Sequence, residues 1–109
     1  MGGIDRTLGA LGLCAKARAL ICGTPMICDA LAGKHKPLLV VAAGDNSEAT
    51  DKRLADKCRY YGVRLTRIQK SGEELAGAVG KDGRLAAVAI TDPNLCRLVS
   101  GTLNENHNA

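Results

Sequence analysis

The stretch Leu38-Leu39-Val40-Val41-Ala42-Ala43 decides the fold of this chain, because it is an unbroken apolar run of strand length. A strand with one face in water alternates apolar and polar side chains, whereas a strand covered on both faces is apolar throughout. Residues 38–43 therefore predict a central strand with helices packed on both faces. Residues 85–90 have the same pattern and predict a second buried strand.

Helical patterns surround these strands. Apolar side chains recur three and four positions apart from Ile4 to Ala17, which predicts an amphipathic helix. Thr24 followed by Pro25 starts a second helix that runs to about residue 32, since proline fits a first turn. Further helices are expected at residues 45–61, 71–79 and 92–99.

The later helices carry start and stop signals. Residues 45–48 offer several N-caps, including Asp45 with Glu48 three positions on, and Gly62 ends that helix. Ser71 and Glu74 form a capping box for the fourth helix. Beyond the last helix, residues 101–109 are polar, and we expect them to fray.

Two more strands complete the sheet. Residues 19–22 form a short strand, and residues 63–68 alternate apolar and charged side chains, which is typical of a strand at a sheet edge. The alternation of helices and strands predicts an α/β protein, a three-layer α/β/α sandwich with a small, roughly four-stranded mixed sheet. We expect one domain at residues 1–103 and a polar C-terminal tail at residues 104–109.

The composition excludes several classes of nucleic-acid binder. Apolar residues make up 46% of the chain, yet it contains two tyrosines and neither phenylalanine nor tryptophan. RNA-recognition motifs and single-strand-binding barrels stack bases on several aromatic rings, so this sequence does not build such a platform. The net charge of +4 suits a polyanionic partner, but the basic residues are spread along the chain, and the fold has to assemble any patch.

No catalytic, metal or cofactor site is predicted. The five cysteines are odd in number and form no Cys-x-x-Cys pair, which argues against a disulfide framework and against zinc. The glycines at positions 77, 80 and 83 fit a helix end and a turn better than a nucleotide-binding loop. Neither His35 nor His107 has a partner that would make it a general base. We expect no small-molecule substrate, and a thiol-dependent enzyme has little support.

The expected location is the cytoplasm. Lys16 and Arg18 interrupt the first 25 residues, which therefore do not resemble a signal peptide. No apolar run approaches the length that crosses a membrane, so no membrane partner is expected. The sequence leaves the oligomeric state open.

Two groups of residues are suited to hold an anion. Gly23 and Thr24 begin a helix directly after a strand, and the free amides at such a helix start can receive a phosphate. The turn at residues 80–85 carries Lys81 and Arg84. We add as electrostatic contacts the cations Lys16, Arg18, Lys34 and Lys36.

Several segments have an order and spacing that characterise one family. They are residues 11–17 (LGLCAKA), Gly23 before a helix, the strand at 38–43 followed by 45–47 (DNS), then 57–63 (KCRYYGV), 74–82 (ELAGAVGKD) and 87–92 (AVAITD). From about residue 8 to residue 99 the chain thus resembles the ribosomal-protein superfamily of the L-seven-Ae and L-thirty-e type, in particular its bacterial YlxQ-like branch.

The resemblance implies an α/β/α sandwich that binds kinked RNA stems, such as those of ribosomal RNA, without catalysis. In the family, the second helix starts with Gly-x-Asn-Glu, and a lysine follows three residues after the glutamate. Gly23 and Thr24 match this pattern. Pro25, Met26 and Asp29 stand at the asparagine, glutamate and lysine positions. The contacts carried over are Gly23, Thr24, Gly80, Lys81, Gly83, Arg84 and Leu85.

An alternative function is a protein-interaction module of the same fold that has lost the RNA determinants. Pro25 removes an amide donor, and Met26 does not hydrogen-bond a guanine edge. Asp29 places a negative charge where a phosphate would lie. In this alternative, Met26 or the thiols face a protein partner.

Overall fold

The computed structural model describes residues 5–107, in which helices and strands alternate. The elements are α1 (Arg6–Lys16), β1 (Leu20–Cys22), α2 (Thr24–Ala32), β2 (Leu39–Ala42), α3 (Glu48–Tyr61), β3 (Arg64–Arg67), α4 (Gly72–Ala78), β4 (Ala87–Ile90) and α5 (Pro93–His107). Each predicted helix and strand is present, with ends that differ by a few residues, except that α5 extends well beyond its expected end at residue 99.

The four strands form one mixed sheet in the order β1-β4-β2-β3. Strand β4 runs antiparallel to both β1 and β2, whereas β2 and β3 are parallel. The two apolar runs thus form the central strands, as predicted, and every residue of β2 and β4 is buried. The charged strand β3 lies at an edge, also as predicted.

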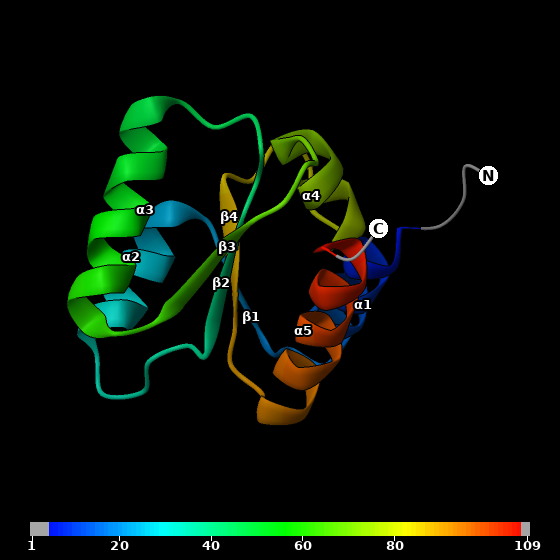
Figure 1. The fold of residues 1–109 in the computed structure, drawn as a ribbon, viewed down its shortest axis with the longest axis horizontal. Helices are drawn as coiled ribbons and strands as arrows, with labels where there is room; N and C mark the ends of the chain where they lie inside the picture. Colours follow the sequence, from blue (N-terminus) through cyan, green and yellow to red (C-terminus); the bar gives the residue numbers. More distant parts are fainter. Residues whose placement is uncertain (1–4, 108–109) are drawn as a thin grey trace.

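Helices cover both faces of the sheet, which confirms the α/β/α sandwich. Figure 1 shows α2 and α3 on one side of the sheet and α1, α4 and α5 on the other. Side chains alternate along each central strand, so Leu39 and Val41 enter the α1 side core, while Val40 and Ala42 enter the α2 side core. Each central strand therefore supplies side chains to both hydrophobic cores.

Local signals fix most of the helix ends. Ser71 and Glu74 form the predicted capping box of α4. Gly62 ends α3 in the left-handed region, at φ 71°, where glycine carries no steric penalty. The N-cap of α3 is Ser47, whose hydroxyl accepts a hydrogen bond from the Thr50 amide. Among the N-caps offered by residues 45–48, Asp45 is thus not the one used.

The expectation that the chain frays from residue 101 is wrong, because α5 continues to His107. The buried hydroxyl of Thr7 donates a 2.9 Å hydrogen bond to Thr102 Oγ1, which in turn donates to the Val99 carbonyl at 2.6 Å. Leu103 is also buried against the core. These contacts with α1 hold the last turns of α5 in place, while the division into a domain and a tail at residue 104 stays a prediction.

We expect Gly44→Ala to destabilise the protein. A Cβ at position 44 would lie 2.5 Å from the Ile68 carbonyl oxygen, so the backbone has to move. Such overpacking costs about 1–3 kcal/mol in the free energy of unfolding. Urea denaturation measures this change.

Gly9→Ala is the matched control, because a Cβ at position 9 of α1 meets no atom within 4 Å. Replacing glycine by alanine inside a helix stabilises by up to about 1 kcal/mol. A Gly44→Ala variant as stable as the wild type would contradict the packing described here.

Candidate functional site

The strand register divides the candidate residues between the two ends of the sheet. Cys22 pairs with Val88 and Ala42 with Ala87, so β1 and β2 finish where β4 begins. We call this the Ala87 end. Leu20 and Leu39 both pair with Ile90, so β1 and β2 begin where β4 finishes, at what we call the Ile90 end.

Seven of the candidates gather at the Ala87 end. The Gly23 amide donates a 3.1 Å hydrogen bond to the Ala87 carbonyl, which places the start of α2 beside the loop that leads into β4. That loop holds the predicted turn, and its left-handed positions are glycines, as expected, with φ 79° at Gly80 and 78° at Gly83. The group comprises Gly23, Thr24, Gly80, Lys81, Gly83, Arg84 and Leu85.

The start of α2 is open. Gly23 is the N-cap at φ 92°, and its carbonyl accepts the first helical bond from Ile27. No side chain caps the helix, and Pro25 has no amide hydrogen. The amides of Thr24 and Met26 are thus left without a helical partner. Met26 is 60% exposed beside them.

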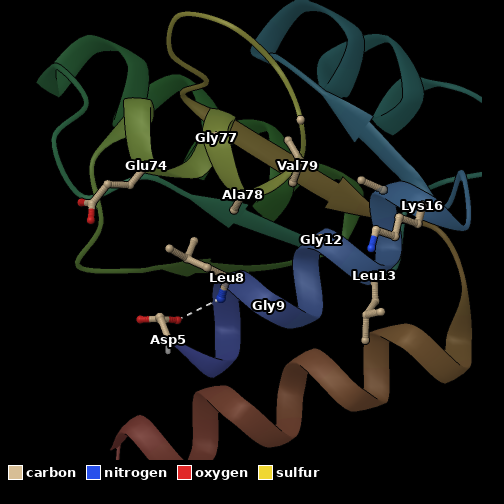
Figure 2. Close-up of a pocket in the computed structure, with 12 residues that line it drawn as sticks. Asp5, Leu8, Gly9, Gly12, Leu13, Lys16, Glu74, Gly77, Ala78 and Val79 are labelled. Carbon is tan, nitrogen blue, oxygen red and sulfur yellow. Dashed lines mark hydrogen bonds between the residues drawn. The ribbon is translucent and has the colours of Figure 1, made fainter. Parts of the chain in front are cut away.

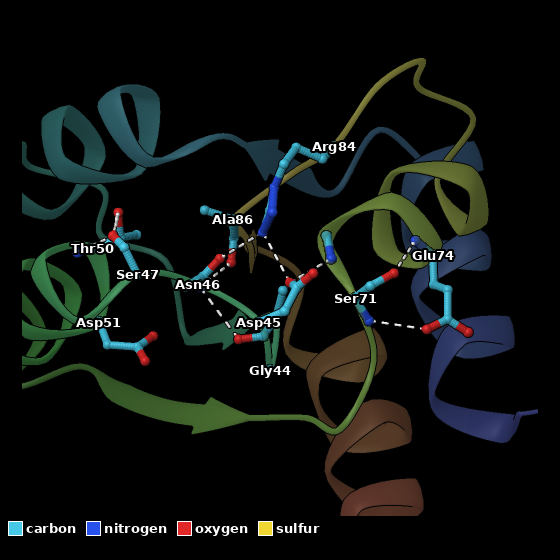
Figure 3. Close-up of polar contacts among 12 residues, drawn as sticks. Gly44, Asp45, Asn46, Ser47, Thr50, Asp51, Ser71, Glu74, Arg84 and Ala86 are labelled. Carbon is cyan, nitrogen blue, oxygen red and sulfur yellow. Dashed lines mark hydrogen bonds and ion pairs between the residues drawn. The ribbon is translucent and has the colours of Figure 1, made fainter.

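Arg84 belongs to a polar network that ties three connections together (Figure 3). Its guanidinium lies 2.9 Å from Asp45 Oδ1 and donates to Asn46 Oδ1 at 3.1 Å. Asp45 also accepts the Gly72 amide at 2.9 Å, while the side chain of Asn46 donates to the Ala86 carbonyl at 2.9 Å. The positive charge of Arg84 is therefore balanced by a carboxylate of the same chain, that of Asp45.

Gly72 leaves room for the guanidinium in this network. A Cβ at that position would lie 2.6 Å from Arg84 Nη2. The guanidinium thus covers the first turn of α4, and a larger residue at position 72 would displace it from this position.

Other cations at this end also have protein partners. Arg67 donates to the Gly44 carbonyl at 2.7 Å and lies 3.6 Å from Asp51. Lys70 lies 3.5 Å from Asp5. Lys81 is exposed and forms no ion pair with any side chain from residue 5 to residue 103. It is the candidate cation best placed to meet an outside anion here.

Three other candidates lie at the Ile90 end. Arg18 precedes β1, and Lys34 and Lys36 precede β2. Lys36 Nζ donates to the Gly33 carbonyl at 2.8 Å and lies 5.3 Å from the centre of the Tyr61 ring. From the sequence, all the candidate cations were expected to contact one ligand. The strand register instead separates Arg18, Lys34 and Lys36 from the start of α2.

Lys16 lies beside a groove between α1 and α4 (Figure 2). The groove has a volume of about 800 Å³ and is lined by glycines of both helices and by Gly80. Its two carboxylates already have structural roles, since Asp5 accepts the Leu8 amide and Glu74 accepts the Ser71 amide. No histidine or cysteine lines the groove among the residues that the structure describes.

The five cysteines are free thiols, and three of them are poorly suited to nucleophilic chemistry. Burial raises the pKa of Cys14, Cys22 and Cys58 above its usual value, and the nearby Lys81 charge only partly opposes this for Cys22. A raised pKa keeps a thiol protonated at neutral pH. Among the side chains of residues 5–103, no three of the metal-binding types lie together.

We expect these thiols to make stability depend on pH only in alkaline solution. Because their pKa is raised in the folded state, the folded protein holds these protons more tightly than the unfolded chain. Their contribution is present in full below the usual pKa of 9.0 and is lost as pH rises above it.

Urea midpoints at pH 7.5, 8.5 and 9.5 test this. Between pH 8.5 and pH 9.5, the midpoint of Cys58→Ala should fall less than that of the wild type. Alkylation of the folded protein at pH 7.5 should be slower at Cys14, Cys22 and Cys58 than for free cysteine. Fast alkylation of any of these three would contradict the burial described above.

Within residues 5–107, no helix combines the length and the apolar character needed to cross a membrane.

Comparisons with known proteins agree with the fold. The model of the family described as ribosomal protein L7Ae/L30e/S12e/Gadd45 matches residues 5–99. The chain is 33% identical over 82 residues to the RNA-binding protein YlxQ of Bacillus subtilis (strain 168), and the match covers 75% of this chain and 79% of that protein.

Two solved structures are also similar. A Bacillus halodurans protein of unknown function superposes with a TM-score of 0.83 at 27% identity, over 93% of this chain and 99% of that one. The Giardia lamblia 15.5kD RNA binding protein gives a TM-score of 0.74 at 19% identity, over 92% and 83%. At 19% identity, the similarity to the Giardia lamblia protein shows a shared fold.

Proposed function

We propose that this chain, which belongs to the ribosomal protein L7Ae/L30e/S12e/Gadd45 family, is a non-enzymatic protein that binds structured RNA at the Ala87 end of its sheet. The bond from the Gly23 amide to the Ala87 carbonyl carries this proposal, because it sets the open start of α2 beside the Lys81 loop. The relative named RNA-binding protein YlxQ supports it.

The contact is made chiefly with phosphates. The amides of Thr24 and Met26 point out of the positive end of α2, which favours an anion. Lys81 adds an unpaired cation on a loop that lies next to them. Arg84 holds the far side of that loop through Asp45 and Asn46, so it acts mainly by positioning.

The RNA is read by shape more than by base contacts. Pro25 offers no donor at the helix start, and Met26 presents an exposed apolar side chain. Asp29 is exposed on α2 and repels nearby phosphate. We therefore propose a kinked or otherwise structured stem as the partner, with ribosomal RNA in the cytoplasm as its source.

A protein-interaction module is the second candidate, and the exposure of Met26 favours it. An unpartnered methionine beside a proline gives α2 a small apolar surface that suits a protein partner. In that case, RNA binding is absent at low salt, where electrostatic attraction is strongest.

The test is binding to a kink-turn RNA and to an unkinked duplex over a salt series, measured by fluorescence anisotropy. We expect the kinked stem to bind more tightly at every salt concentration. Equal, weak and steeply salt-dependent binding to both would mean attraction by charge alone.

Lys81→Gln should weaken binding to the kinked stem and lower the slope of log affinity against log salt by about 1, as expected for one lost phosphate contact. Lys52→Gln is the matched control, because it removes the same charge from an exposed lysine that pairs with Asp56 on α3. Equal losses in both variants would remove Lys81 from the site.

A further inference from the structure

An exposed tyrosine at the Ile90 end is unusual in a chain with two aromatic residues. Tyr60, near the end of α3, is 80% exposed. Its ring meets the Tyr61 ring edge to face, with centroids 4.8 Å apart and an interplanar angle of 88°. Lys36 lies over Tyr61 at 5.3 Å. The ring of Tyr60 is therefore supported from within the protein and left open toward solvent.

Cations lie on the same helix as this ring and on a neighbouring connection. Lys57 and Arg53 precede Tyr60 by three and seven positions, so the three side chains share one side of α3. Arg64, which begins β3, pairs with Leu39 of the α1 side core and so lies on the face of the sheet opposite α3. The C-terminal end of α3 lies at the same end of the sheet as the connection before β2 (Figure 1). That connection carries Lys34 and Lys36. Figure 1 shows the connection passing beneath the C-terminal end of α3.

These cations are not balanced by carboxylates. Among the side chains described, from residue 5 to residue 103, no carboxylate forms an ion pair with Lys34, Lys36, Arg53 or Lys57. Asp56, the nearest acid on this helix, is paired with Lys52. At the Ala87 end, by contrast, Arg67, Lys70 and Arg84 all have acidic partners. Unbalanced like charges repel one another unless a polyanion neutralises them.

We propose that Tyr60, Lys34, Lys36, Arg53 and Lys57 form a second RNA contact, the tyrosine surface, which holds a single-stranded segment. Tyr60 stacks on an unpaired base, and the cations contact the adjoining phosphates, which is how proteins hold single strands without reading sequence. This proposal rests on the proposed function, since the strand is taken to flank the stem bound at the Ala87 end.

The dimensions suit one RNA that reaches both surfaces. The molecule is about 30 Å across its shorter axes. At about 3.4 Å for each nucleotide of a strand, a flank of roughly ten nucleotides spans that width. One tyrosine is too few for a platform of several bases, but it is enough for a single base in such a flank.

The experiment compares a blunt kinked stem with the same stem carrying a 12-nucleotide single-stranded flank of mixed sequence, by fluorescence anisotropy. The flank should raise the affinity of the wild type. Tyr60→Ala should remove at least about fivefold of this gain, in line with the loss of one stacked base, and should leave binding of the blunt stem unchanged. Tyr60→Phe keeps the ring and should keep the gain.

Lys57→Gln should also reduce the gain, whereas Lys52→Gln, which removes the same charge from the same helix, should not. Thermal melts of the Tyr60 variants check the fold. No gain from the flank, a full gain in Tyr60→Ala, or equal effects at positions 52 and 57 would each overturn the tyrosine surface while stem binding stands.

Two further outcomes have distinct meanings. In one outcome, poly-glutamate of equal charge displaces the single-stranded flank, and Tyr60→Ala binds poly-glutamate as tightly as the wild type does. That result would indicate an acidic protein as the partner and overturn the proposal. Failure of the wild type to bind even the blunt stem would overturn the proposed function itself.

Discussion

Burial of the two central strands on both faces is the constraint on which the rest of the structure depends. No residue of β2 or β4 reaches solvent, and each strand supplies alternate side chains to two cores. The aliphatic composition meets this demand, because branched and small apolar side chains pack on both sides of a sheet. With both faces covered by helices, the ends of the sheet and the outer helix surfaces are left for contacts with other molecules.

The sequence predicted the elements well because their signals are local. The capping box at Ser71 and the glycine at position 62 lie within a few residues of the ends that they define. Long-range pairing was not predictable in the same way. The bond from Thr7 to Thr102 joins residues 95 positions apart, and the pair of Arg84 with Asp45 spans 39 positions. No local pattern indicates either contact, so the length of α5 was missed and Arg84 looked like a free cation.

The distribution of charge separates the two ends of the sheet in a way that net charge does not. The chain carries a formal charge of +4, which by itself favours no particular surface. At the Ala87 end, the cations other than Lys81 hold connections together, and an open helix start offers amides instead. At the Ile90 end, the cations on α3 and on the connection before β2 have no acidic partners, and the ring of Tyr60 is exposed. Register, which depends on distant parts of the chain, decides to which end each cation belongs.

The packing of α1 against α5 also bears on how the protein is made. The strand partner of β1 is β4, which lies more than sixty residues further along the chain. The hydrogen-bond acceptor of the buried Thr7 hydroxyl is Thr102, 95 positions away. A ribosome releases the chain from its N-terminus, so the first helix and strand leave the exit tunnel long before their native neighbours exist. The segment from α2 to β3, with its parallel strand pair, is complete much earlier. The contacts that join α1 and β1 to β4 and α5 are therefore the last whose partners are both synthesised.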